Sequence, residues 1–249
     1  MRGHDVISAR AVVLDSADAV ASHVAAFLLE QSLKTQGVFR VALSGGSTPK
    51  KLYTLMAQPG YAAQFPWERV QFFYGDDRFV PRSSPDNNGG MVQDILFSRV
   101  PVPSGNIFPM PDSGDPDDAA AAYEAALKRV YGADHLEQGK PLFDVVLLGL
   151  GENGHTASLF PRQPVLKEKT RWVASCVPDD APHTRLTLTY PAIASSRHVL
   201  FLVTGASKEA VLKRVRAGDP AEPASHIRSE GEIVWVMDRD AAGRHPEGE

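Results

Sequence analysis

Short apolar runs that alternate with amphipathic helical segments constrain this chain more than any other feature of its sequence. The run Asp144–Leu150 is almost wholly apolar, as expected of a strand that helices cover on both faces. Because helices between strands form right-handed crossovers, the alternation predicts a mainly parallel sheet. The expected strands are Ala11–Leu14, Phe39–Leu43, Val70–Tyr74, Asp144–Leu150, Leu186–Tyr190, His198–Val203 and Ile233–Met237. The expected helices are Ala17–Leu33, Pro49–Met56, a segment near Met91–Phe97, Asp117–Tyr131 and Ser207–Val215.

The domain organisation that this pattern predicts is a single α/β domain over residues 1–249. A chain of 249 residues fits one large α/β domain or two small ones. The expected loops Pro101–Asp118 and Pro161–Lys169 are too short and too ordinary in composition to be interdomain linkers. The predicted fold is a Rossmann-like, mainly parallel sheet flanked by helices on both faces, with room for a small α/β subdomain.

The net charge and the cysteine content limit which classes of partner and which cellular compartment are expected. The formal net charge is −4, so the chain lacks the basic surplus of proteins that bind nucleic acid or anionic membranes. No apolar run approaches the roughly 20 residues of a membrane span, and the N-terminus lacks the apolar region of a signal peptide. The single cysteine, Cys176, excludes an internal disulfide and is expected to be a core thiol. A cytoplasmic protein whose anionic ligands are held by a few local cations is therefore expected.

Polar residues at the ends of the expected strands are the candidate ligand-binding residues, because ligands of open parallel sheets bind at the carboxyl ends of the strands. The first exit reads Ser44-Gly45-Gly46-Ser47-Thr48-Pro49. Its glycines and the following helix N-terminus favour an anion site, although a capped turn explains the composition equally well. The P-loop ending is absent, and Ser47–Lys50 matches the S-x-x-K of serine acylases without their partner motifs.

The second exit, Asp76-Asp77-Arg78 followed by Asn88, combines acids with one arginine. Spacing alone favours a solvated loop. Neighbouring carboxylates also hold a guanidinium in place where it must meet an oxyanion, so both interpretations stay open.

The third exit, Gly149–Pro161, contains a G-x-G-x-x-G and one histidine, His155. As a dinucleotide fingerprint the match is weak, because a helix beginning here would stop at Pro161. Such a helix N-terminus beside His155 would disfavour the imidazolium, and a neutral imidazole is what a general base requires. Two further cations, Arg185 and Lys208, follow later strand or loop transitions and are expected at the same edge.

Taken together, these segments resemble the 6-phosphogluconolactonases, part of a wider phosphosugar group that includes glucosamine-6-phosphate deaminase. The resemblance extends over roughly residues 11–237. Its most specific part is His-Thr-Ala-Ser-Leu-Phe-Pro, ending at Pro161, where the deaminases continue differently. Four positions depart from the family pattern. Asn153 replaces an aspartate before the Gly-His pair, and Asp77 replaces a glutamate. Asn87 and Gly89 replace a serine and a tyrosine on either side of Asn88.

The resemblance implies a lactone hydrolase acting on a phosphorylated sugar lactone, with no metal, cofactor or covalent nucleophile and as a monomer or weak homodimer. His155 would be the general base, and Arg78 or backbone N–H groups would stabilise the oxyanion. The residues implied in substrate binding are Ser44, Gly45, Gly46, Ser47, Thr48, Asp76, Asn88, Asn153, Arg185 and Lys208.

Three rival functions stay open at this point. A deaminase or isomerase would need a second carboxylate near His155, where the sequence offers only Asn153 and Ser158. A non-catalytic sugar-phosphate sensor would be expected to carry an N-terminal helix-turn-helix, for which the residues before Ala11 are too few. A nucleotide-dependent oxidoreductase rests on the G-x-G-x-x-G alone.

Overall fold

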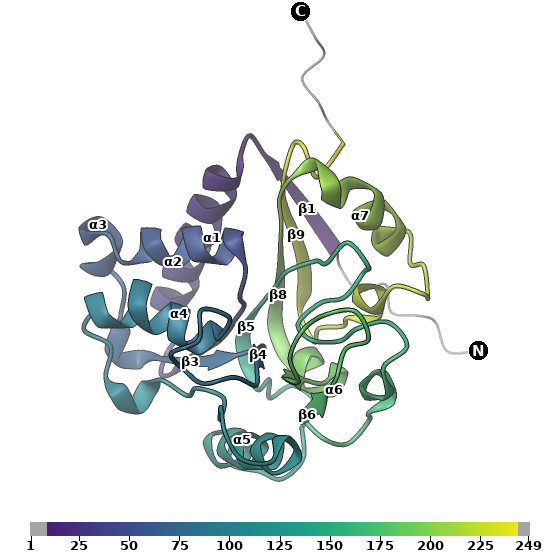
Figure 1. Ribbon diagram of the computed structural model, residues 1–249. Coiled ribbons are helices and arrows are strands. Elements are labelled where there is room, and N and C mark those ends of the chain that lie inside the picture. The colour runs from purple at the N-terminus through teal and green to yellow at the C-terminus, as the bar shows by residue number, and fades with distance from the viewer. Residues whose placement is uncertain (1–8, 244–249) are drawn as a thin grey trace, which may run out of the picture.

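A parallel sheet of six strands forms the centre of the computed structural model, which describes residues 9–243 (Figure 1). The strand order is β1-β9-β8-β5-β2-β3, and every neighbouring pair is parallel, as predicted. The strands are β1 (Ala9–Leu14), β2 (Phe39–Leu43), β3 (Val70–Tyr74), β5 (Phe143–Leu148), β8 (Ser196–Val203) and β9 (Glu232–Asp238). Val145 and Val146 of β5 point to opposite faces of the sheet and are both fully buried, so apolar side chains are needed on both faces of this strand.

Helices flank this sheet: α1 and α2 lie on one side of β8 and β9, and α7 lies on the other (Figure 1). Ser16 caps α1 by accepting a hydrogen bond from the Ala19 N–H. The helices are α1 (Ala17–Lys34), α2 (Ser47–Met56), α3 (Pro59–Ala62), α4 (Asn88–Ile95), α5 (Pro116–Tyr131), α6 (Tyr190–Ala194) and α7 (Glu209–Arg216). Short 3₁₀ turns are η1 (Trp67–Arg69), η2 (Phe97–Arg99), η3 (Ser104–Asn106), η4 (Pro164–Lys167), η5 (Ala206–Lys208) and η6 (Pro223–His226). Among residues 9–243, every helix is too short or too polar to span a membrane.

A second, antiparallel sheet has the order β4-β7-β6 and was not predicted as a unit. Its strands are β4 (Asp76–Arg78), β6 (Val173–Cys176) and β7 (Arg185–Leu188). The polar stretch at residues 75–88 thus contains a strand, and Tyr190, expected in a strand, begins α6 instead. Cys176 is buried on β6, as predicted.

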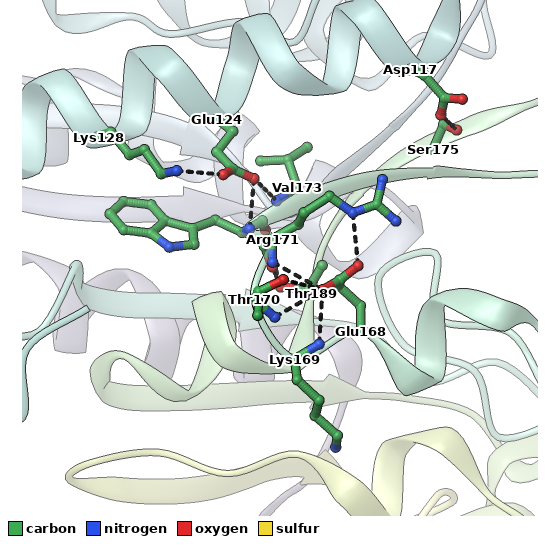
Figure 2. A network of polar contacts seen from close by, with 11 residues as sticks. Asp117, Glu124, Lys128, Glu168, Lys169, Thr170, Arg171, Val173, Ser175 and Thr189 are labelled. Atoms are coloured by element: carbon green, nitrogen blue, oxygen red, sulfur yellow. Dashed lines mark hydrogen bonds and ion pairs between the residues drawn. The ribbon is translucent and has the colours of Figure 1, made fainter. Parts of the chain in front are cut away.

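The edge strand β6 is covered by α5 rather than left open. The Glu124 carboxylate on α5 accepts hydrogen bonds from the backbone N–H groups of Trp172 and Val173 (Figure 2). Lys128 forms an ion pair with the same carboxylate. These contacts satisfy edge N–H groups that would otherwise be open to another strand.

The order of the strands creates a crevice between β2 and β5. From β2 the chain passes through α2 to β3 on one side, whereas β5 leads towards β8 on the other. Connections that leave in opposite directions open a crevice at the carboxyl ends of the two strands, where ligands of open α/β sheets bind.

Candidate functional site

A cavity of about 260 Å³ opens at this crevice. Its walls come from the segments that follow β2, β3, β5 and β8, together with β4 and β7. Of the residues predicted for the site, those that line the cavity are Ser44, Gly45, Gly46, Ser47, Thr48, Asp76, Arg78, Asn88, His155, Arg185 and Lys208. Asn153 lies behind the cavity wall, in contact with His155. The sequence interpretation missed Thr156 and Thr204, which also line the cavity.

The loop after β2 presents the N-terminus of α2 to the cavity. Gly46 is the N-cap residue, and no side chain caps this helix. The alternative of a serine- or threonine-capped turn is therefore wrong, and the first-turn amides are left for an anion. The Tyr53 hydroxyl holds Ser44 from behind, donating to its carbonyl at 2.7 Å and accepting from its N–H at 3.0 Å.

Two arginines face each other at the opposite wall. Arg78 on β4 and Arg185 on β7 are directly paired in the antiparallel register. Each donates to a backbone carbonyl, Arg78 to Asp86 and Arg185 to Pro182, and the Nε of each is buried without a partner. Burial, and next the positive charge of Arg78, lower the pKa of Arg185. Like charges placed opposite each other destabilise a sheet, so this pair has the features of an anion site.

The two aspartates of β4 are buried, so the alternative of a solvated loop is wrong. Asp77 accepts the backbone N–H groups of Arg78, Asn88 and Gly89 at 2.7, 2.7 and 2.9 Å, which fixes the start of α4. This helix was expected near Met91 and begins earlier because of these bonds. Burial raises the pKa of Asp77 to about 6.

Asp76 points a carboxylate towards the cavity. Its Oδ2 accepts a hydrogen bond from the Ser158 hydroxyl at 2.6 Å, and burial raises its pKa. From the sequence, the candidates beside His155 for a second acid or base are Asn153 and Ser158, and neither is a carboxylate. The pairing of β4 with β7 instead brings Asp76 to the same cavity as His155.

His155 is half-buried, and its imidazole stacks on the Phe160 ring with centroids 4.2 Å apart. Its Nδ1 lies 2.6 Å from Asn153 Oδ1. Burial is the largest cause that lowers the pKa of His155 to about 4; the positive charges of Arg185, Lys208 and Arg78 lower it further, and Asp180 opposes them. The neutral imidazole that the sequence predicted is therefore present, for a different reason.

The sequence analysis attributed the neutral imidazole to a helix N-terminus beside His155. Residues 149–161 form turns and contain no helix, so this part of the prediction is wrong. Gly151 leaves room for the ring, since a Cβ there would lie 2.0 Å from His155 Nδ1, and Gly154 adopts a φ of +76°. The G-x-G-x-x-G thus shapes a histidine-bearing turn, and the helix N-terminus that a dinucleotide pyrophosphate needs is not formed here.

The remaining cation, Lys208, stands in η5 at the end of β8. Nearby, the hydroxyls of Thr48 and Thr204 lie 2.7 Å apart and join the start of α2 to the end of β8. Within residues 9–243, neither Lys208 nor either cavity arginine forms an ion pair with a carboxylate. The same residues contain no cluster of three His, Cys, Asp or Glu side chains placed to hold a metal ion.

Comparison with known proteins agrees with this arrangement. Residues 15–235 match the family described as glucosamine-6-phosphate isomerases/6-phosphogluconolactonase. The chain belongs to this family. The resemblance expected from the sequence is thereby confirmed.

Several relatives and solved structures are close. A 6-phosphogluconolactonase of Synechocystis sp. is 40% identical over 218 residues, covering 86% of this chain and 87% of that protein. The chloroplastic 6-phosphogluconolactonase 3 of Arabidopsis thaliana is 36% identical, over 87% of this chain and 68% of its own. The structure of 6-phosphogluconolactonase from Trypanosoma cruzi superposes with a TM-score of 0.85 at 28% identity, covering 97% and 98% of the two chains. A monomeric glucosamine-6-phosphate deaminase shares the fold at 19% identity and a TM-score of 0.78, over 95% of this chain and all of its own.

Proposed function

We propose that this protein hydrolyses 6-phospho-D-glucono-1,5-lactone to 6-phospho-D-gluconate, the lactonase step of the oxidative pentose phosphate pathway. The observation that carries the proposal is one cavity that combines a neutral imidazole, His155, with three cations that lack carboxylate partners among the described residues: Arg78, Arg185 and Lys208. A phosphorylated lactone brings the anion for the cations and the ester carbon for the base. The relatives named 6-phosphogluconolactonase support this choice of substrate.

The tautomer of His155 follows from its two contacts with Asn153. The backbone N–H of His155, which can only donate, points at Asn153 Oδ1 at 3.2 Å, so this atom is an acceptor. The same oxygen lies 2.6 Å from the ring Nδ1. Nδ1 must then carry the proton, and Nε2 keeps the lone pair that a base requires.

In the proposed reaction, His155 Nε2 removes a proton from a water molecule as its oxygen bonds to C1 of the lactone. The tetrahedral oxyanion then collapses, the bond from C1 to the ring oxygen breaks, and the proton returns to that oxygen. General-base assistance of this kind contributes a factor of about 10²–10⁴ in rate. An activated ester of this type needs no covalent intermediate.

The phosphate is assigned to the amides of Gly45 and Gly46 with Arg185 and Lys208. Three features support this assignment: the uncapped start of α2, the partnerless Nε of Arg185 and the position of Lys208 on the same cavity. Arg78 stands beside Arg185 and serves either the phosphate or the oxyanion. Binding the remote phosphate orients C1 against the base.

Asn153 departs from the aspartate that the family resemblance implies at this position. A carboxylate there would stabilise the imidazolium that forms as the water loses its proton. The amide supplies orientation without that charge. We therefore expect His155 to be a weaker base in this chain than one paired with a carboxylate.

The test is an assay of freshly prepared 6-phospho-D-glucono-1,5-lactone, with the spontaneous hydrolysis subtracted. We expect turnover well above the background, and a Lys208→Ala variant with a raised KM for this substrate. Unphosphorylated glucono-1,5-lactone is the control for the phosphate assignment, because Lys208→Ala should leave its hydrolysis unchanged. Equal losses on both lactones would contradict that assignment, and no turnover by the wild-type protein would contradict the proposed function.

Asp76 favours a second candidate, a glucosamine-6-phosphate deaminase or related isomerase, since such enzymes need a carboxylate beside the histidine. Its Oδ2 is engaged by Ser158, but the group still lines the cavity. Incubation with glucosamine 6-phosphate and measurement of released ammonia separates the two. Ammonia release faster than lactone hydrolysis would reverse the order of the candidates.

A further inference from the structure

The turn that carries His155 is held from outside the cavity at the residue just before the histidine. The Gly154 carbonyl accepts a hydrogen bond from the Ala224 N–H at 3.0 Å. The side chain of Glu222 fills the space beside the Gly154 Cα, since a Cβ on Gly154 would lie 1.7 Å from Glu222 Oε2. Glu222 itself does not line the cavity.

Glu222 is buried and held in turn by α7. Its Oε1 accepts a hydrogen bond from Arg214 Nε at 2.5 Å, and Arg214 lies in the helix that follows Lys208 directly. A buried carboxylate without its cation is costly, so the pair constrains both side chains. A continuous set of contacts therefore links α7 to the peptide that precedes His155.

We propose that Glu222, fixed by Arg214, is a positioning residue that sets the place of the His155 imidazole in the cavity. The inference rests on the proposed function, in which His155 is the base. Within the turn, the Gly151 N–H donates to the His155 carbonyl, and the Thr156 hydroxyl donates to the Gly149 carbonyl. Such bonds preserve the shape of the turn. Ser158 anchors its later part to the second sheet, through Asp76 and Thr187. Glu222 and Ala224 hold the part that directly precedes His155.

The steric part of this role separates it from a purely ionic one. Glu222→Gln keeps the length and an oxygen for Arg214 Nε, so we expect kcat close to that of the wild type. Glu222→Asp keeps the charge but withdraws the carboxylate from Gly154, and Glu222→Ala removes it. Because a displacement of about 1 Å can cost a factor of about 10² in rate, we expect kcat to fall about tenfold or more in both variants, with KM nearly unchanged.

The matched control is Asp144→Asn, which breaks another partly buried ion pair. Asp144 binds Arg197 at 3.1 Å at the amino-terminal end of β5, away from the cavity. We expect it to lower the melting temperature but not kcat. A kcat within twofold of wild type in both Glu222→Ala and Glu222→Asp would overturn the inference, as would an equal fall in Asp144→Asn.

A readout that does not depend on turnover is the titration of the His155 imidazole, followed by nuclear magnetic resonance. Arg78, Arg185, Lys208 and Asp180 act on the ring in all variants. A displaced ring is better solvated, so its pKa should rise towards 6.5 in Glu222→Asp but not in Asp144→Asn. If the wild-type protein lacked lactonase activity, the proposed function would fail, and an unchanged titration in Glu222→Asp would still overturn the positioning role by itself.

Discussion

Two clusters of charged side chains in this molecule differ in how their charges are matched. In the network around Glu168 on the surface, one carboxylate accepts the backbone N–H groups of Lys169, Thr170 and Arg171 and the Arg171 Nε (Figure 2). These hydrogen bonds lower the pKa of Glu168, the Arg171 N–H first. In the cavity, by contrast, Arg78 and Arg185 form no ion pair with a carboxylate of residues 9–243, and the nearby Asp76 carboxylate is hydrogen-bonded to Ser158. A matched cluster stabilises its own chain, whereas an unmatched one is ready for an anion from outside.

The largest expected effect comes from removing the base. His155→Ala should lower kcat by about a hundredfold or more, because the general base is removed and the Asp76 carboxylate of the same cavity is hydrogen-bonded to Ser158. KM should stay nearly constant, since the cations that hold the phosphate are untouched. Steady-state assays with the spontaneous rate subtracted measure both constants.

His135→Ala is the control, because this histidine is exposed and distant in sequence from every cavity residue. Circular dichroism should show both variants folded. Wild-type turnover in His155→Ala would remove the imidazole from the reaction and leave the cavity as a binding site.

How much of the fold could be predicted from the sequence depends on the type of residue that forms each strand. The parallel sheet was predictable because strands such as β5 are apolar on both faces, which leaves a signal in a single run of residues. The strand β4 was not, because it consists of two acids and an arginine and exists only through pairing with the distant β7. The sequence therefore suggested Asp76 as a site residue but did not predict that it is buried against Ser158.

The site residues were largely predictable because strand ends of a parallel sheet converge, whatever the loops do. The conformation of the loops was not. A glycine-rich exit after β5 suggests a helix, but Gly154 and Ala157 both adopt positive φ values and turn the chain instead. Thr204 gives no signal as a single threonine, and Glu222 reaches Gly154 only through the folded α7.

Replacing one arginine by methionine in each of the two clusters tests the comparison most directly. Arg185→Met removes a charge-assisted contact with the phosphate, worth about 1.5–3 kcal/mol, so KM should rise by about tenfold to a hundredfold. The same change relieves the repulsion from Arg78, so the free energy of unfolding without substrate should rise by about 0.5–1 kcal/mol.

Arg171→Met in the surface network should do the opposite. It removes the ion pair with Glu168 and lowers the free energy of unfolding by up to about 1 kcal/mol, with KM unchanged. Urea titrations and steady-state assays of both variants give the four values. Loss of stability together with an unchanged KM in Arg185→Met would place this residue with the structural arginines.

The smallest expected effect follows from giving His155 in the cavity a carboxylate partner, like the partners in the network around Glu168. Asn153→Asp places a carboxylate against His155 Nδ1, which should raise the pKa of the imidazole from about 4 by about one unit or more. Only the unprotonated imidazole accepts a proton from water, so kcat/KM of the wild type should fall only as the pH drops through about 4. In the variant, this acid limb should move to higher pH, while the rate above pH 7 changes by less than about tenfold.

The control is Glu152→Gln, which changes the charge of the exposed residue directly before Asn153 and should leave the acid limb of the pH profile in place. An equal and opposite shift in that control would mean that the overall charge of the turn, rather than the contact with residue 153, sets the basicity of His155.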